Sequence, residues 1–434
     1  MLNPELLSPE VQQFIDAHLQ EESARLLLKK SPFSRVSMQE IARQIKGKQK
    51  CRKKLPTWHQ TPGIIYPSTL SLEQCSSELT GAYKAGLCTN ASGSIADLTG
   101  GAGVDSYFFS KHFRVVTHVE RSEDLSEIAA HNLPLLGARH VKFICGDGID
   151  LIRANQGSPG KYGDHSTPAS ETKVSQAIPS FDWIYLDPSR RGRGQQRVFM
   201  LQDYEPNFIP YLDALLAAAP RVMIKTSPLI DLIYGINAFR FVLEIHVVAV
   251  KNECKEILWI LGREQTSLCD TPQITCATLS EQGSDLFKYS LAEEASLPPT
   301  PLSQPLTYLY EPGAALLKAG AFKTVGARMG VAKLHANSHL YTSGKLINGF
   351  PGRRYRLLES LPVKEFARRY KGRKINLSTR NFPASADALQ KKYRITQGGD
   401  DHAFFTTIAE DANIRGTGSL AAGARHLVLI AERL

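Results

Sequence analysis

The stretch Asp97-Leu98-Thr99-Gly100-Gly101-Ala102-Gly103-Val104-Asp105 decides the fold that we predict for this chain. It follows a short apolar run at residues 94–96 and precedes Tyr107-Phe108-Phe109, where we expect a helix. Three glycines between a strand and a helix let the main chain approach a ligand closely, and the helix offers unpaired N–H groups. This geometry suits a nucleotide-like ligand. The carboxylate of Asp97 disfavours a pyrophosphate beside it and favours a ligand that carries an ammonium or a sulfonium group.

The segments that follow predict a doubly wound α/β sheet. After the first strand, strands are expected at residues 115–120, 141–145, 182–186 and 221–225, with helical segments between them. Two further β-rich runs, 241–250 and 256–261, are separated by only five residues. So short a link excludes a helical crossover and predicts an antiparallel hairpin. We therefore expect a Rossmann-like sheet of seven strands. A nicotinamide-binding domain would instead end in another parallel strand.

Acidic residues stand at the ends of the first four predicted strands. They are Asp97, Glu120, Asp147 and Asp187. A carboxylate after the second strand binds ribose hydroxyls in doubly wound folds. A lone acidic loop residue is more often a solvated surface group, but four at successive strand ends indicate a ligand-binding edge.

This pattern resembles the class I S-adenosylmethionine-dependent methyltransferases, and the resemblance implies roles for individual residues. Glu120 would bind the ribose hydroxyls and Asp147 the adenine amino group, while Asp187 and Pro188 would border the transferred methyl group as catalytic residues. Gln74 and Ser77 are weaker cofactor candidates, for which a plain surface position is the alternative. The remaining cofactor-binding residues implied by the resemblance are Asp97, Thr99, Gly100, Gly101, Gly103 and Asp105.

Motifs over most of the chain resemble one bacterial group of these enzymes, which carries a ferredoxin-like module and a C-terminal THUMP-like domain. The resemblance rests on residues 73–78, 97–105, 187–191, 311–314 and 398–403. We expect an N-terminal helical region at 1–90, the methyltransferase domain at 91–265, the ferredoxin-like α+β module at 266–348 and the THUMP-like domain at 349–434. THUMP domains in general imply RNA binding.

The charge of the chain is unevenly distributed. The 434 residues include 52 Lys and Arg against 42 Asp and Glu, a net charge of +10. Residues 341–395 hold 14 basic and 3 acidic residues, and residues 29–54 hold ten basic residues against Glu40. Charge runs are usually solvated faces, but two of them beside a methyltransferase core favour nucleic acid, and RNA in particular, as the partner. The substrate-binding candidates are Arg190, Arg191, Lys225, Arg353, Arg354, Arg368, Arg369, Lys371, Arg373 and Lys374.

Other features narrow the class and the compartment. No run of eighteen apolar residues predicts a membrane span, and the N-terminus lacks a signal-peptide pattern. Seven scattered cysteines form neither a disulfide framework nor a CxxC pair, so we expect reduced thiols, a cytoplasmic protein and no metal site. Within 1–90, Ser37 and Glu40 predict a capping box, and one helix is expected from Ser71 to Lys84. Residues 155–180 are expected to form an insertion.

The chemistry stays open at this point. Amino-group methyltransferases commonly place an aromatic residue at the fourth position of the motif that here reads Asp187-Pro188-Ser189-Arg190. The motif looks more like that of uracil C5 RNA methyltransferases, but residues 225–228, Lys-Thr-Ser-Pro, lack the cysteine nucleophile that those enzymes need. The leading hypothesis is a methyltransferase acting on rRNA or tRNA. A non-catalytic cofactor-binding RNA-interaction protein, and a methyltransferase acting on DNA, protein or a small molecule, are the alternatives.

Overall fold

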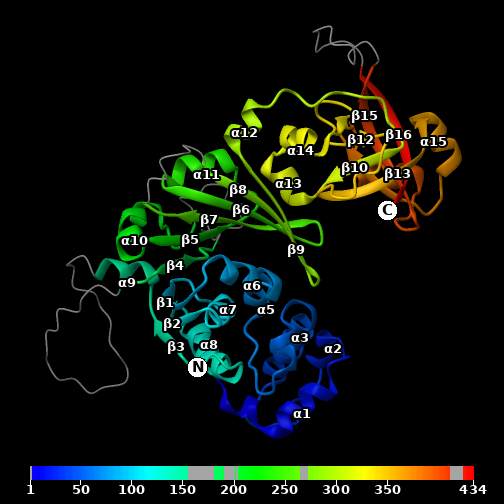
Figure 1. Cartoon of the computed structure of the whole chain (residues 1–434). Coiled ribbons are helices and arrows are strands. Elements are labelled where there is room, and N and C mark those ends of the chain that lie inside the picture. The colour runs from blue at the N-terminus through cyan, green and yellow to red at the C-terminus, as the bar shows by residue number, and fades with distance from the viewer. Residues whose placement is uncertain (1, 155–179, 190–200, 202–203, 264–271, 411–423) are drawn as a thin grey trace. The chain divides into compact units, whose positions relative to one another are not determined.

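The computed structural model describes residues 2–154, 180–189, 201, 204–263, 272–410 and 424–434 (Figure 1). The chain divides into two compact units. Unit 1 comprises Met1–Glu244 and Ile257–Ser267, and unit 2 comprises Ile245–Glu256 and Leu268–Leu434. Of the expected insertion at 155–180, only residue 180 lies among the described residues.

Unit 1 begins with short helices around a small apolar core. The helices are α1 (Pro9–Ala17), α2 (Ser23–Leu26), α3 (Met38–Lys54), α4 (Pro56–Gln60), α5 (Thr69–Gln74) and α6 (Glu78–Leu87). The predicted capping box is confirmed: the Ser37 side chain accepts from the Glu40 N–H, and the Glu40 carboxylate accepts from the Ser37 N–H. This pairing satisfies two N–H groups that would otherwise be orphaned at the start of α3.

The prediction of a single helix from Ser71 to Lys84 is wrong, because the helical conformation is interrupted between α5 and α6. Cys75 is extended, with φ −64° and ψ 162°. Ser77 caps α6 through a capping box with Thr80. The hydroxyl of Ser76 donates to the carboxylate of Asp105. Long-range polar contacts thus prevail over the local helical pattern.

The predicted α/β sheet is confirmed and extended. Among the described residues its strand order is β3-β2-β1-β4-β5-β7-β6-β8-β9. Strands β1 to β5 pair in parallel, whereas β7 is antiparallel to β5. The strands are β1 (Asn90–Asp97), β2 (Phe113–Glu120), β3 (Val141–Cys145), β4 (Trp183–Leu186), β5 (Arg221–Thr226), β6 (Val242–Val250), β7 (Glu253–Leu261), β8 (Gln273–Ser280) and β9 (Gly283–Ser290).

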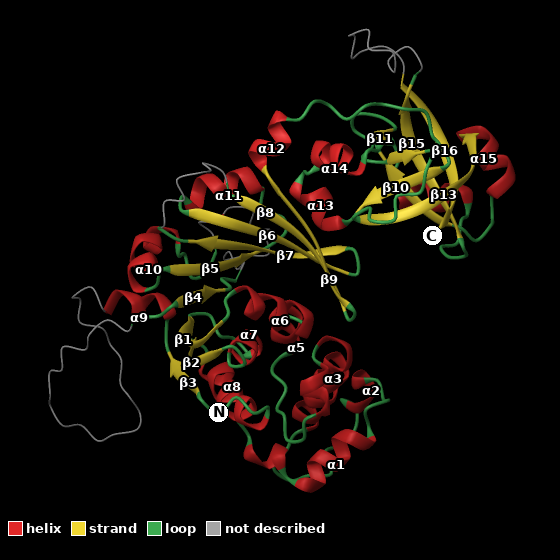
Figure 2. Cartoon of the chain, in the orientation of Figure 1, coloured by secondary structure: helices red, strands yellow, loops and turns green. Residues whose placement is uncertain are grey.

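Helices lie on both sides of the parallel strands, with α6, α7 and α8 on one side and α10 and α11 on the other (Figure 2). The helices within and after the parallel strands are α7 (Val104–Phe109), α8 (Glu123–Leu135), α9 (Gly148–Ala154), α10 (Leu212–Ala218) and α11 (Leu232–Phe239). Gly81 lets α6 approach α7, because a Cβ atom there would lie 2.5 Å from the Phe108 ring. The N-terminal helical region therefore packs directly on the helix that follows the glycine loop.

A two-residue turn joins β6 to β7, which is shorter than the five-residue link expected from the sequence. Lys251 and Asn252 both have positive φ, 52° and 60°. Two central residues with positive φ are the signature of a type I′ turn, whose twist matches that of an antiparallel hairpin. The tip of this hairpin, residues 245–256, belongs to unit 2.

Unit 2 contains a second sheet, which we call the C-terminal sheet. Among the described residues its order is β11-β12-β10-β13-β16-β15-β14. Its strands are β10 (Tyr308–Pro312), β11 (Ala332–Lys333), β12 (Tyr341–Ser343), β13 (Gly352–Pro362), β14 (Asn376–Arg380), β15 (Asp401–Ala409) and β16 (Ala424–Arg433). The helices of this unit are α12 (Leu291–Ser296), α13 (Ala314–Ala319), α14 (Phe322–Met329), α15 (Val363–Tyr370) and α16 (Ala386–Tyr393).

A buried carboxylate fastens the C-terminal sheet across one face. Glu311 at the end of β10 is only 1% exposed and pairs with Arg353 of β13 at 3.2 Å and with Arg380 of β14. β10 and β14 are separated by three strands in the sheet order, so the sheet must curl to bring Arg380 to Glu311. The ion pairs of Glu311 with Arg353 and Arg380 hold the sheet in this curved form.

We predict that Glu311→Gln weakens the C-terminal sheet. The substitution leaves two guanidinium groups without their carboxylate, and we expect a loss of about 3 kcal/mol, the lower end for broken buried pairs because the arginines are partly solvated. Hydrogen–deuterium exchange of the β13 and β16 amides would show faster opening. Glu432→Gln, which breaks the exposed pair with Arg356, is the control and should change the opening free energy by less than about 0.5 kcal/mol. Equal exchange in both variants would contradict the prediction.

Candidate functional site

The four acidic residues predicted at strand ends lie along one edge of the sheet in unit 1. Asp97 and Glu120 are the last residues of β1 and β2, Asp147 follows β3 and Asp187 follows β4. Parallel pairing places Asp97 opposite His118 and opposite Tyr185 in the two neighbouring strands. Carboxyl ends of parallel strands are where doubly wound folds bind ligands.

The glycine loop is shaped by its neighbours as well as by its own torsion angles. A Cβ atom at Gly100 would lie 2.1 Å from the His118 ring, and Gly103 combines a φ of +81° with close contact to Leu133. No larger residue fits at these positions without a shift of the structure. The Gly101 N–H donates to the Glu120 carboxylate at 2.8 Å, so this carboxylate also fixes the loop.

Asp97 begins a buried chain of hydrogen bonds beneath the loop. The Ser106 hydroxyl donates to Asp97 Oδ2 at 2.6 Å and lies 3.0 Å from His118 Nδ1. Both Asp97 and His118 have no exposed surface, and Nε2 of His118 has no hydrogen-bond partner among the described residues. Burial raises the pKa of Asp97 to about 8, with the Asp105 carboxylate adding to the rise, and burial lowers the pKa of His118 to about 4.

Asp105 is held by protein partners from several elements. Its carboxylate accepts from Ser76 Oγ at 2.9 Å and from the Tyr185 hydroxyl at 2.9 Å, and it lies 3.3 Å from the ammonium group of Lys84. Burial opposes ionisation of Asp105, but Lys84 and then Lys225 outweigh it, so its pKa is lowered. Lys84 itself is fully buried. The geometry makes Asp105 a junction between α7, β4 and the segment before α6.

Asp187 lies beside a lysine and beside the glycine loop. Its carboxylate pairs with Lys225 of β5, and its main-chain N–H donates to Thr99 Oγ1 at 2.6 Å. Pro188, next in the chain, is buried and continues this edge. The ammonium group of Lys54 donates to the carbonyl groups of Leu72 and Glu73 at 2.7 and 2.9 Å. Burial lowers the pKa of Lys54, and the charge of Lys225 adds to this effect.

The other candidates in unit 1 have plainer surroundings. Gln74 is exposed at the end of α5. Ser77 uses its hydroxyl to cap α6, accepting from the Thr80 N–H at 3.2 Å. Asp147 accepts from the Ile149 N–H at 2.8 Å, at the start of α9. Arg190 and Arg191 lie outside the described residues.

The sequence patterns did not predict the buried side chains whose hydrogen bonds and ion pairs hold the residues of this edge in place. Ser76, Lys84, Ser106, His118 and Tyr185 are not strand-end residues, and their partners lie on other elements. One signal was available: a lysine inside the apolar face of a predicted helix, as at Lys84, needs a buried counter-charge.

The basic candidates of unit 2 differ in how they are paired. Arg369 makes a bidentate pair with Glu359, at 2.7 and 3.0 Å. Arg353 pairs with Glu311, Arg354 donates to the Asn348 carbonyl group, and Arg368 lies 3.7 Å from Glu365. Within the described residues, Lys371, Arg373 and Lys374 make no ion pair with a carboxylate.

Across the residues that the structure describes, no group of three or more His, Cys, Asp or Glu side chains is placed to hold a metal ion. In the same part of the chain, no helix has the length and hydropathy needed to span a bilayer.

Comparisons with known proteins identify relatives of the whole chain and of its C-terminal part. Family models match residues 308–351, as a ferredoxin-like domain, and residues 352–416, as THUMP domain-like. A protein from Porphyromonas gingivalis W83, whose crystal structure is known and which is proposed to be a methyltransferase, is 30% identical. The similarity covers 100% of this chain and 99% of that one, with a TM-score of 0.81.

More distant similarities are partial. An S-adenosylmethionine-dependent methyltransferase from Agrobacterium tumefaciens is 16% identical over 43% of this chain and 61% of its own, with a TM-score of 0.29. An rRNA methylase from Streptococcus thermophilus is 14% identical over 43% of this chain and 96% of its own, with a TM-score of 0.28. Similarities this low say nothing about activity. No functionally curated protein matches the chain.

We predict that Asp97 makes the stability of unit 1 depend on pH. The folded chain retains the Asp97 proton up to about pH 8, whereas an unfolded chain releases it near pH 4. In this window the folded state binds more protons, so the free energy of unfolding falls as the pH rises, by up to about 1.4 kcal/mol per pH unit from this group. Asp97→Asn should remove this component.

Urea unfolding at several pH values would measure the effect. The fluorescence of Trp58, Trp183 and Trp259 reports on unit 1, because the chain has three tryptophans and all belong to that unit. The same pH dependence in wild type and Asp97→Asn would show that Asp97 ionises normally in the folded chain.

Proposed function

The chain belongs to the class I methyltransferases that carry a ferredoxin-like module and a THUMP-like domain, and we propose that it methylates RNA with S-adenosylmethionine as the methyl donor. The observation that carries this proposal is the line of four carboxylates along the sheet edge, beside a loop that only glycines can form. We also propose the domain limits 1–90, 91–265, 266–348 and 349–434. The family-model matches at 308–351 and 352–416 support the last two.

The residues at the sheet edge fit this cofactor chemically. The carboxylates of Asp97, Glu120, Asp147 and Asp187 gather along this edge, and Lys225 pairs with that of Asp187, so the edge favours a cationic ligand. A Cβ atom at Gly101 would meet only the Thr99 carbonyl oxygen, at 3.9 Å, which leaves open space beside the loop. Thr99, Gly100, Gly101 and Gly103 would hold the methionine end together with Asp97.

Each carboxylate has a distinct role in the proposal. Glu120 would bind the ribose hydroxyls while it keeps the Gly101 N–H, since a carboxylate has about four acceptor sites. Asp147 would bind the adenine amino group. Asp105 would act through Lys84 and Tyr185, by positioning the helix after the loop. Gln74 and Ser77 would close the methionine end.

The acceptor side of the site is formed by Asp187, Pro188 and Lys225. S-adenosylmethionine supplies a methyl group that its sulfonium already activates, so the protein mainly has to orient the acceptor and exclude water. The Asp187 carboxylate, held by Lys225, would anchor the acceptor and accept its proton, while the Thr99 hydroxyl holds the Asp187 main chain in place. Arg190 and Arg191 would contact phosphate.

RNA is the favoured substrate because of the THUMP-like match and the basic charge that surrounds it. The match covers 352–416, and most of the 14 basic residues of 341–395 lie within it. Of the candidates named from the sequence, Arg353, Arg354, Arg368 and Arg369 have protein partners, which leaves Lys371, Arg373 and Lys374 freest to meet phosphates.

We predict that the chain binds S-adenosylmethionine and that Asp97→Asn and Glu120→Ala each weaken binding. Each variant loses a charge-assisted hydrogen bond, so the Kd should rise by about ten- to a hundredfold in isothermal titration calorimetry. The control is Asp150→Ala, which removes an exposed carboxylate of α9 and should leave the Kd unchanged. Unchanged affinity in both folded variants would place the cofactor elsewhere.

We predict that Asp187→Asn separates binding from catalysis. Cofactor affinity should stay within about twofold, while methyl transfer falls by at least about a hundredfold, because the carboxylate faces the acceptor. The measurement is incorporation of labelled methyl groups into total cellular RNA, followed by nucleoside mass spectrometry. Asp213→Asn, at an exposed site on α10, is the control and should retain activity. Label found in DNA or protein instead would reassign the substrate, and full activity of Asp187→Asn would move the acceptor site.

A further inference from the structure

Two basic segments that are twenty residues apart in the sequence lie side by side in unit 2. The Gly372 N–H donates to the Tyr393 carbonyl group at 2.9 Å, and the Thr396 N–H donates to the Arg373 carbonyl group at 3.1 Å. A third bond runs from the Ile375 N–H to the Thr396 carbonyl group at 3.0 Å. These main-chain bonds join the turn at 371–374 to the end of α16, so the two segments form one continuous patch.

The patch, which we call the basic surface, consists of six exposed cationic residues. They are Lys371, Arg373, Lys374, Lys391, Lys392 and Arg394. Within the described residues, none of them pairs with a carboxylate, whereas the arginines of β13, β14 and α15 named above mostly do. Charges that the fold does not neutralise internally are the ones that can neutralise a ligand.

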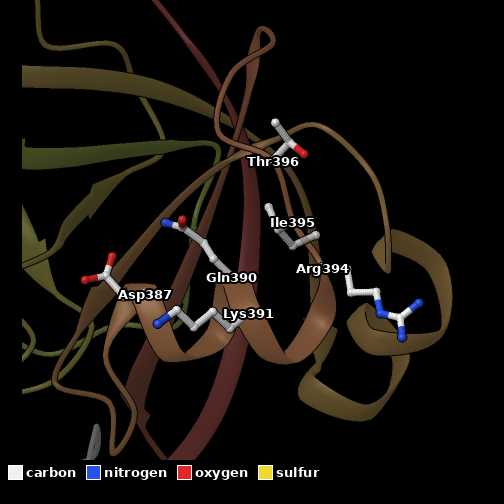
Figure 3. Close-up of a pocket in the computed structure, with 6 residues that line it drawn as sticks. All are labelled: Asp387, Gln390, Lys391, Arg394, Ile395 and Thr396. Atoms are coloured by element: carbon white, nitrogen blue, oxygen red, sulfur yellow. The ribbon is translucent and has the colours of Figure 1, made fainter.

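A hollow lies next to these charges at the end of α16 (Figure 3). Its volume is about 520 Å³. It is lined by Asp387, Gln390, Lys391, Arg394, Ile395 and Thr396. Figure 3 shows Gln390, Lys391 and Asp387 along one side of it, with Ile395 and Thr396 nearer the strand. The lining thus combines two cations, one carboxylate, two neutral hydrogen-bonding groups and one apolar side chain.

Helix electrostatics accounts for only part of this arrangement. Lys391 and Lys392 stand in the last turn of α16, where cations interact favourably with the negative end of the helix dipole. That effect does not explain the three cations at 371–374, which the main chain brings beside them. Nor does it explain the absence of carboxylate partners for all six within the described residues.

We infer that the basic surface binds the phosphates of single-stranded RNA, with the hollow at the end of α16 receiving a nucleotide. The inference rests on the proposed function and gives that RNA a defined place on the chain. Unpaired Lys and Arg side chains neutralise backbone phosphates regardless of sequence, and the Gln390 and Thr396 side chains in the hollow can hydrogen-bond to a base.

A membrane surface fits the patch less well. Helices that bind the bilayer interface expose large apolar residues next to their basic ones. Among the described residues of unit 2, the large apolar side chains that are exposed lie at Leu286, Leu306, Leu346, Leu358 and Leu434. None of them belongs to 371–374 or 391–396.

The test measures binding of a short fluorescent single-stranded RNA to the full chain, by fluorescence anisotropy over a range of KCl concentrations. Two triple variants are compared with wild type: Lys371→Gln with Arg373→Gln and Lys374→Gln, and Lys391→Gln with Lys392→Gln and Arg394→Gln. Each should weaken binding at least about tenfold near 0.1 M salt and reduce the slope of log K against log salt by about 2, from three lost contacts.

A charge-matched control separates this surface from the net charge of the chain. Arg114→Gln with Lys142→Gln and Lys288→Gln removes three exposed cations from β2, β3 and β9, and should leave the slope unchanged. Equal losses in the control and in the two variants, or wild-type slopes in both variants, would overturn the inference. Stronger binding of the wild type to anionic phospholipid vesicles than to RNA, lost in the same variants, would also overturn it by making a membrane the partner.

Cofactor binding distinguishes this inference from the proposed function. Both triple variants should bind S-adenosylmethionine with wild-type affinity and should melt at the wild-type temperature, because the changes are confined to exposed side chains. Loss of RNA binding with retained cofactor binding supports the basic surface. If the wild type binds RNA through this surface but transfers no methyl group, the proposed function fails while the surface stands.

Discussion

The buried ion pair between Asp105 and Lys84 is the interaction on which unit 1 depends. Removing a carboxylate and an ammonium group from water costs several kcal/mol for each ion, and their attraction offsets this only when other hydrogen bonds satisfy them. Ser76 and Tyr185 donate such bonds to Oδ2 of Asp105, and the Lys84 ammonium group donates to the Ser76 hydroxyl at 2.8 Å. The four side chains come from α7, α6, the segment before α6 and β4. The pair therefore sets where the helical region lies on the sheet, and with it the position of the helix that follows the glycine loop.

The carboxylates at the sheet edge explain why this region is electrostatically more favourable with a ligand bound than without one. Several carboxylates converge there, and like charges at short range oppose one another's ionisation. Lys84 and Lys225 offset two of them, whereas Asp97 keeps its proton because it is buried and because the Asp105 carboxylate lies near it. A cation that binds at this edge would replace a proton with a better partner, so a site that is strained electrostatically when empty is complementary to a positively charged ligand.

The sequence predicts those parts of the structure that depend on local pattern. Apolar runs, a short link between two β-rich segments and acidic residues at strand ends were enough to predict the five parallel strands and the antiparallel hairpin. They did not predict that β8 and β9 extend the same sheet. The break at residues 75–77 was not foreseen, because it depends on Ser76 reaching Asp105, 29 positions away. β13 was also missed: its arginine-rich sequence has little strand character of its own, and pairing with β10 and β16 makes it a strand. The same limit applies to the basic residues. Their number can be counted in the sequence, but which of them form ion pairs with carboxylates of the same chain cannot be read from it.

The position of β16 has a consequence for how the C-terminal sheet folds. β16 lies between β13 and β15, in the interior of this sheet, although its residues, 424–433, follow those of the other six strands in the sequence. Until β16 pairs with them, β13 and β15 each present an unpaired edge, and such edges invite pairing with other chains. The segments of unit 1 all precede residue 268, so they are synthesised well before β16. A chain truncated before residue 424 would therefore keep two exposed strand edges in its C-terminal sheet and would be prone to aggregate.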